Sequence, residues 1–289
     1  MNVRTNRMVR RGSAALLAAL ALILGGCSVI ESLGVQKPSA RIAGVGLKDV
    51  GLESLTLLFD VEVKNPYSVP LPLVNLDYSL ASRGTPFLSG KADELPPSIP
   101  ANSTETLPLP AKVTYLKLFE ALKGVKPGAV VPYTAEMGLR VDPAGLGELR
   151  LPLKKQGQVP IPTAPDVRVT EIKWDELTLD RAGGRVMLRL TNRNQFALKL
   201  TGMAYGLSLG GVDVATSSIA KPAAFDADGG AATVEIPLAL SPKKLGLAAF
   251  NMLTGTGTGY KLTGAVDVQT PFGPMKLPIE AVGKTVFRR

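Results

Sequence analysis

Apolar and polar residues alternate along most of the chain, which is the period of a β-strand with one buried face. The clearest run is residues 54–64, whose inward positions are Leu55, Leu57, Phe59, Val61 and Val63. A second run, residues 74–80, would bury Val74, Leu76, Tyr78 and Leu80. Further runs of this period occupy residues 185–191, 234–240 and 262–268. The pattern therefore predicts a mainly β protein.

Two short segments have helical spacing instead. Apolar residues at i, i+3, i+4 and i+7 form one face of a helix, and the first such face is Tyr115, Leu118, Phe119 and Leu122. The second predicted face is Leu245, Ala248, Ala249 and Met252. The sequence also predicts helix ends, with N-caps at Thr114 and Ser241, proline at the first helical position at Pro242, and stops at Gly124 and Gly255.

The elements after residue 40 occur twice in the same order. The segment 65–80 corresponds to 192–207 without a gap, an offset of 192 − 65 = 127, and Tyr133 and Tyr260 share that offset. Further on, residues 151–153 correspond to 277–279 with an offset of 277 − 151 = 126. Duplication of one domain explains this match, and the Pro- and Gly-rich stretch 157–165 is the predicted linker.

We therefore predict two tandem antiparallel β-sandwich domains of the immunoglobulin or fibronectin-III type. They occupy residues 40–160 and 165–289, with roughly seven strands and one short α-helix in each. Prolines recur inside strand patterns at Pro108, Pro152, Pro237 and Pro278. Proline cannot donate to a ladder, so these strands are predicted to be edges or to be bulged. The alternative, a polyproline ligand, needs the prolines outside strands.

The first 27 residues have the order of a bacterial lipoprotein signal. Four arginines precede an apolar run of about 11 residues, which is shorter than the roughly 20 of a membrane span. The run ends in Gly25-Gly26-Cys27, which resembles a lipobox, and Cys27 is the only cysteine of the chain. This predicts a signal peptide over 1–26, acylation of Cys27 with fatty acids such as palmitate, and a tether over 27–39. Ser28 then favours the outer membrane, facing the periplasm.

Composition excludes several kinds of chemistry. The chain has no histidine, so neither a Ser-His-Asp nor a Cys-His arrangement exists, and the commonest metal ligand is missing. No motif for a carboxylate pair or a Ser-Lys dyad is present. We therefore predict a non-enzyme with no cofactor and no metal. With one cysteine, the chain has no intramolecular disulfide and depends on core packing.

The positive charge gives little indication of a partner. The chain has 33 basic and 24 acidic residues, and four of the basic ones lie in the signal. The remaining 29 against 24 leave a balance of +5. No basic stripe with interleaved aromatics is present, so no nucleic acid is expected. The small basic clusters are interpreted as solvated surface, with weak attraction to anionic headgroups as the alternative.

The strand ends carry a short motif that resembles a known family. Asn65-Pro66-Tyr67 is followed by Tyr78 in the next strand, and Asn192-Arg193-Asn194 by Tyr205. The pattern resembles the water stress and hypersensitive response domain of late-embryogenesis-abundant type 2 proteins, which has asparagine-proline-asparagine after its second strand. The first copy lacks the second asparagine, and the second copy lacks the proline. The resemblance covers about residues 40–287.

The physical role predicted for the motif is structural. An asparagine at a strand end accepts from the backbone N–H two residues on and makes an Asx-turn. Proline then stops the ladder. A binding role for Asn65 or Asn192 is the alternative.

The resemblance implies protection against desiccation or related stress, without a chemical reaction. The predicted protein is a folded sandwich held at an envelope membrane by its lipid, where it stabilises membrane or client proteins. Two alternatives stay open. One is a periplasmic module that binds a lipid or another apolar ligand, favoured by an open apolar slot under residues 245–252. The other is a structural partner in an envelope complex, favoured by a contiguous exposed apolar patch.

Overall fold

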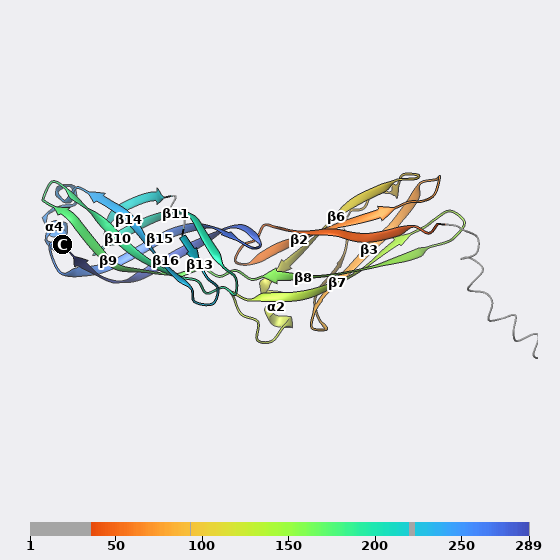
Figure 1. Ribbon diagram of the computed structural model, residues 1–289, viewed down its shortest axis with the longest axis horizontal. Coiled ribbons are helices and arrows are strands. Elements are labelled where there is room, and N and C mark those ends of the chain that lie inside the picture. The colour runs from red at the N-terminus through yellow and green to blue at the C-terminus, as the bar shows by residue number, and fades with distance from the viewer. Residues whose placement is uncertain (1–35, 93, 220–222, 289) are drawn as a thin grey trace, which may run out of the picture.

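Two β-rich units lie end to end in the molecule (Figure 1). The computed structural model describes residues 36–92, 94–219 and 223–288, so the predicted signal peptide, Cys27 and most of the predicted tether lie outside the described residues. The first unit runs from β1 (Ser39–Lys48) to β8 (Leu149–Pro160), and the second from β9 (Asp166–Leu177) to β16 (Gly273–Arg288). The predicted class, mainly β with antiparallel sheets in tandem units, is confirmed.

The first unit packs antiparallel sheets around one apolar core. Within the described residues one sheet has the order β1-β2-β6 and the other β4-β3-β7-β8, with β5 paired to β3. Its other elements are β2 (Ser54–Lys64), β3 (Leu71–Ser82), β4 (Thr85–Lys91), β5 (Ser98–Ile99), β6 (Thr104–Thr114), α2 (Tyr115–Ala121) and β7 (Val130–Val141). The inward side chains of both sheets form a single buried cluster.

In the second unit the ladders join into one sheet, in the order β12-β11-β15-β16-β9-β10-β14, with β13 on β11. Its other elements are β10 (Ala182–Thr191), β11 (Leu198–Leu209), β12 (Val212–Ile219), β13 (Ala223–Phe225), β14 (Ala231–Leu240), α3 (Pro242–Leu245), α4 (Leu247–Leu253) and β15 (Gly257–Thr270). The sheet is continuous because the end of β16 pairs in parallel with residues 171–173 of β9.

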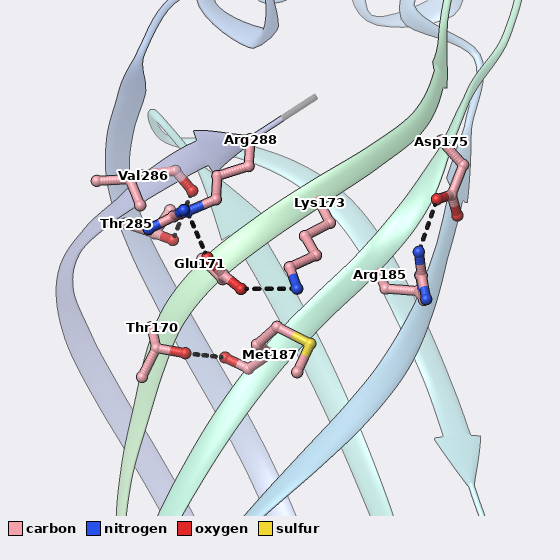
Figure 2. A network of polar contacts seen from close by, with 9 residues as sticks. All are labelled: Thr170, Glu171, Lys173, Asp175, Arg185, Met187, Thr285, Val286 and Arg288. Atoms are coloured by element: carbon pink, nitrogen blue, oxygen red, sulfur yellow. Dashed lines mark hydrogen bonds and ion pairs between the residues drawn. The ribbon is translucent and has the colours of Figure 1, made fainter.

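Ion pairs reinforce this parallel join (Figure 2). The Glu171 carboxylate lies 2.7 Å from Nε of Arg288 and 3.2 Å from Nζ of Lys173, so it bridges β16 and β9. Among the described residues of the first unit no ladder forms the equivalent join. With the 126 offset the end of β16 corresponds to residues 160–162, where Pro160 has no N–H and the chain leaves for the second unit.

The inward positions of the first predicted strand are all fully buried. In β2 the five alternate residues from Leu55 to Val63 have no exposed surface. The prediction for β3 was wrong at one position, since Val74 is 49% exposed. The ladder with β7 pairs Leu73 and Asn75 with consecutive partners, so Val74 is an extra, bulged residue. A bulge turns one side chain out of the alternation.

The bulges recur at equivalent places in the two units. An extra residue interrupts the β1-β2 and β9-β10 ladders, the β3-β7 and β11-β15 ladders, and the β3-β4 and β11-β12 ladders. The extra residues are Ala43 and Thr170, Val74 and Thr201, and Phe87 and Val214. The offset is 127 each time, for example 170 − 43 = 127, so these three irregularities repeat together with the sequence. The β9-β10 ladder has a further extra residue, Asp175, without a counterpart in the β1-β2 ladder.

The strand prolines lie at edges, as predicted. Among the described residues β6, β8 and β14 each pair with one strand, and these contain Pro108, Pro152 and Pro237. Pro278 lies in the part of β16 that pairs with β15 alone. A missing N–H therefore leaves no gap in a ladder.

The predicted N-caps do not form. Neither Thr114 nor Ser241 makes a side-chain cap bond. Backbone carbonyls satisfy the first helical N–H groups instead, because Tyr115 N donates to Glu53 O at 2.9 Å and Lys243 N donates to Leu179 O at 2.9 Å. The strand before each helix thus places the helix start beside a backbone carbonyl of another segment.

The helical segment of the second unit breaks in the middle. Gly246 has φ 92° and ψ 163°, which separates α3 from α4 and turns the buried face. Ala249 and Leu253 are buried, Leu245 and Met252 are half-buried, and Ala248 is exposed. The predicted face was therefore wrong for Ala248 and missed Leu253, whereas the face predicted for α2 packs on the core.

Candidate functional site

The first asparagine of the motif lies directly after β2 and is 1% exposed. Asn65 Oδ1 accepts from the Tyr67 N–H at 3.0 Å, which is an Asx-turn. Its Nδ2 lies 2.9 Å from the carbonyl oxygens of Val69 and Pro100 and 3.2 Å from that of Ile99. One buried amide therefore ties the loop after β2 to the segment after β5.

Pro66 ends the ladder at this point. The last bond before it runs from Asn65 N to Ser103 O at 2.9 Å. Proline has no N–H to continue the pairing, and the chain turns toward β3.

Asn192 repeats this geometry after β10 and is fully buried. Its Oδ1 accepts from Asn194 N at 2.9 Å, and its Nδ2 donates to Phe196 O at 2.7 Å and Asp226 O at 2.9 Å. The amide of Asn194 also donates to Asn192 Oδ1, at 2.9 Å. The bonded positions, two and four residues on, are those of the first unit.

The second asparagine of this copy, Asn194, binds the linker. Its Oδ1 accepts from Thr163 N at 2.8 Å, and its Nδ2 donates to Thr163 O at 3.0 Å. Both backbone groups of one linker residue are thus satisfied by a single amide. The preceding Arg193, which stands where the family motif has proline, forms an ion pair with Asp166 at the start of β9.

The next residue, Gln195, contacts the first unit. Its N–H donates to Gly128 O at 2.7 Å, and its Oε1 accepts from Val130 N at 3.0 Å. Gly128 has φ 91°, and a Cβ there would lie 2.3 Å from the Arg193 carbonyl oxygen. The motif loop of the second unit is therefore part of an inter-unit joint, formed by residues 128–130, 161–163 and 193–195. The sequence did not predict this joint. Its only signal in the sequence is Asn194, the second asparagine of the motif, which the second copy retains and the first copy lacks.

The two motif tyrosines lie in the middle of strands, away from the asparagine loops. Tyr78 pairs with Gly90 and Met137, and Tyr205 lies at the equivalent position of β11. Tyr205 is buried and its hydroxyl donates to Pro237 O at 3.4 Å. Burial raises the pKa of Tyr205, and a hydrogen bond with Ser217 opposes this in part. The structure therefore does not bring the tyrosines and asparagines into one site.

The remaining shifted groups do not form a catalytic arrangement. Burial raises the pKa of Tyr115 and of Tyr133. The pKa of the exposed Glu136 is lowered by its hydrogen bond and charge interaction with Lys154, 2.9 Å away. In the part of the chain that the structure describes, no group of three or more acidic, cysteine or histidine residues is placed to hold a metal. No helix of that part is long and apolar enough to cross a membrane.

The chain is similar to plant proteins that are named as desiccation protectants or late embryogenesis abundant proteins. A desiccation protectant protein Lea14 homolog of Glycine max is 34% identical over 133 residues, 46% of this chain and 87% of that protein. The late embryogenesis abundant protein Lea14-A of Gossypium hirsutum is 32% identical over the same shares. The matched length is close to one repeat. The solution structure of AT1g01470 from Arabidopsis thaliana is 31% identical over 45% of this chain and 85% of that chain, with a TM-score of 0.37.

A family model described as late embryogenesis abundant protein matches residues 60–157 and 187–283. Each match falls in one of the two units. The first contains Asn65 and the second contains Asn192, the asparagine that follows the second strand of its unit. The chain therefore belongs to the late embryogenesis abundant type 2 family, with the family's domain present in two tandem copies.

Proposed function

We propose that the protein is a folded, non-enzymatic water-stress protectant held at a bacterial envelope membrane. The observation that carries the proposal is the tandem family match, together with relatives that are named desiccation protectants. The finer assignment of each unit to the water stress and hypersensitive response domain is part of the proposal. It rests on the buried asparagine that follows the second strand in both copies.

The way the fold is held together supports this function. A buried amide fixes the strand end in each unit, and each unit has its own apolar core. The chain has no histidine and a single cysteine, at position 27. The fold of the units therefore depends neither on a disulfide nor on the protonation state of a histidine. A protectant has to remain folded as water is withdrawn and solutes are concentrated, and this construction fits that demand.

Packing at α4 favours the protectant over the apolar-ligand module. Leu253 has no exposed surface and lies in the core cluster of the second unit. A Cβ on Gly210 would lie 2.2 Å from the Met252 sulfur, so the half-buried methionine fills the space between α4 and the hairpin of β11 and β12. An open apolar slot at this helix would have favoured ligand binding, and tight packing there supports the protectant instead.

The membrane anchor is the second part of the proposal. Acylation of Cys27 would leave residues 28–39 as a tether, whose extended reach is on the order of 40 Å. The place after Cys27 is occupied by serine, which favours the outer membrane on its periplasmic side. Cys27→Ser should move the protein from the membrane fraction to the soluble periplasmic fraction. Equal fractionation of the variant and the unaltered protein would contradict the anchor.

The protectant part is tested separately with purified protein. The protein should slow the aggregation of an unrelated enzyme during heating and freeze–thaw, with no nucleotide and no metal added. The control is an equal mass of albumin, and equal protection by albumin would refute the proposal. In cells, a deletion strain should lose survival after drying. Leakage of the outer membrane without loss of drying survival would instead support an envelope structural partner.

A further inference from the structure

Two strands of the second unit separate after their short parallel join. The parallel pairing begins at Val286 and Glu171. Before these residues the described ladders contain no pair between β16 and β9. A hollow of about 860 Å³ lies between residues 164–170 and 280–284. We call this hollow, between residues 166–170 of β9 and 280–284 of β16, the seam.

The backbone groups of β16 along the seam point into it. The hairpin of β15 and β16 closes at the pair Thr270 and Gly273, and hydrogen-bonded and non-bonded pairs then alternate along an antiparallel ladder. Pro274 and Pro278, which cannot donate, occupy non-bonded places of this alternation. Residues 280, 282 and 284 share their parity, so the N–H and C=O groups of these three residues face away from β15.

The β9 side of the seam is satisfied by a side chain. The Val169 N–H donates to the Tyr260 hydroxyl at 3.2 Å. Tyr260 is 7% exposed and its ring crosses the backbone of Gly283, where an added Cβ would lie 3.0 Å away. The tyrosine thus forms the floor of the seam, below the two strand edges.

The chemistry of the seam fits a polypeptide better than an acyl chain. The floor is apolar, with Val167, Val169 and Ala281 buried beside Tyr260. The β16 wall, however, presents backbone donors and acceptors, and an acyl chain would cover them without bonding. An extended peptide satisfies them as an added strand. Prolines block the free edges of β6 and β14, and none lies in residues 166–170 or 280–284.

In the first unit a polypeptide segment lies beside the strand that corresponds to β16. Tyr133 corresponds to Tyr260, and it lines a hollow of about 610 Å³ with β1, β8 and the tip of the β15-β16 hairpin. The tip residues there are Pro271 and Phe272, which come from the second unit. Its β8 residues 155–158 correspond to residues 281–284 of the seam, whereas Val45 and Leu47 of β1 correspond to residues 172 and 174, beyond the seam. The chain itself thus covers part of this edge in the first unit, and no described residue of the first unit lines the seam of the second.

We propose that the seam of the second unit binds an extended segment of a client polypeptide as an added β-strand between β9 and β16. This inference rests on the proposed protectant function and names where a client is held. The added strand would bond the free groups of Val282 and its neighbours. It would replace the Tyr260 hydroxyl as the partner of Val169 N–H, and place its apolar side chains on the floor.

The test uses a fluorescein-labelled peptide of alternating valine and threonine with lysine ends, and the purified protein. Binding is measured by fluorescence anisotropy, and amide hydrogen exchange locates the peptide. Residues 166–170 and 280–284 should exchange more slowly when it is bound. A peptide with proline at every second valine should not bind, because it cannot form a ladder.

Val282→Pro removes a seam N–H that makes no bond with β15, at an edge where Pro278 already stands. It should weaken peptide binding by at least about tenfold. The matched control is Thr106→Pro, at an exposed place of β6 with the parity of Pro108 and Pro110. This variant should bind as the unaltered protein does. Circular dichroism verifies both folds, and if Val282→Pro is unfolded the exchange map of the unaltered protein decides.

Slower exchange at any other strand edge, or unchanged peptide affinity in folded Val282→Pro, would refute peptide binding at the seam. The proposed function fails in a different way. If the peptide binds at the seam but the protein protects clients no better than albumin, the seam stands and the protectant function does not. If Val282→Pro loses the peptide but still protects clients, protection stands and client capture at the seam is refuted.

Discussion

Replacing Asn192 by alanine tests whether the motif is structural. The change removes donors to the carbonyls of Phe196 and Asp226 and the acceptor of the Asn194 backbone and side-chain N–H groups. Three of these four bonds are buried. At about 1 kcal/mol for each buried bond the free energy of unfolding should fall by about 3 kcal/mol. For a unit of this size that corresponds to a decrease in Tm of about 10 °C.

Trp174 makes the measurement specific to the second unit. It is the only tryptophan of the chain, is 6% exposed, and lies in β9. Its fluorescence during urea unfolding therefore reports the unit that contains Asn192. Asn251→Ala on the exposed face of α4 is the matched control and should change stability by less than about 0.5 kcal/mol.

The same tryptophan separates the two copies of the motif. Asn65→Ala should leave the Trp174 transition within about 0.5 kcal/mol of the unaltered protein, since the sites are far apart. A loss in Asn192→Ala no larger than in Asn251→Ala would refute the structural role of the motif. Loss of client protection without loss of stability would instead indicate a binding role.

Three further outcomes are expected. Gly128→Ala should loosen the joint while each unit stays folded, because a Cβ at φ 91° meets a carbonyl of the facing motif loop; small-angle X-ray scattering should show a broader distribution of shapes, and an unchanged profile would contradict this. Leu253→Ala should cost about 2–5 kcal/mol, whereas Leu247→Ala, 69% exposed, should cost almost nothing; equal losses would refute the assigned face. Burial raises the pKa of Tyr115 in the folded state, so the stability that this neutral tyrosine contributes is present below its unfolded pKa of about 10 and is lost as the pH rises above that value. The urea concentration at half-unfolding should therefore fall between pH 8 and pH 11, and an unchanged midpoint would contradict this.

The strand pattern could be predicted because alternation is a property of neighbouring residues. Every inward position of β2 was correct, and the edge prolines followed from the missing N–H. The bulge at Val74 was not predictable, because one extra residue in a ladder is decided by the partner strand. The caps failed for a similar reason, since Glu53 and Leu179 reach the helix starts from distant parts of the chain.

The joint and the seam lay beyond the reach of the sequence. In the sequence Asn194 and Gln195 are ordinary loop residues. Their contacts with residues 128–130 and 161–163 are formed only in the folded chain. The seam depends on where β16 leaves β9, and the parallel join of residues 286–288 is unlike every other pairing in the described chain. The asparagines after the second strands were predictable, because an Asx-turn uses only the next two residues.

The repeated bulges give the order of events in the history of the chain. Three extra residues at equivalent places in both units are most simply inherited, so a single ancestral unit already contained them before it was copied. The change of offset from 127 to 126 falls between the last two strands of each unit. Seven residues, 142–148, separate the paired Val141 and Leu149 in the first unit, whereas six, 269–274, separate the equivalent pair Val268 and Met275 in the second. That loss or gain came after the copying. So did the divergence of Tyr67 and Asn194, which left one copy with a loop that bonds within its own unit and the other with a loop that also bonds to the linker.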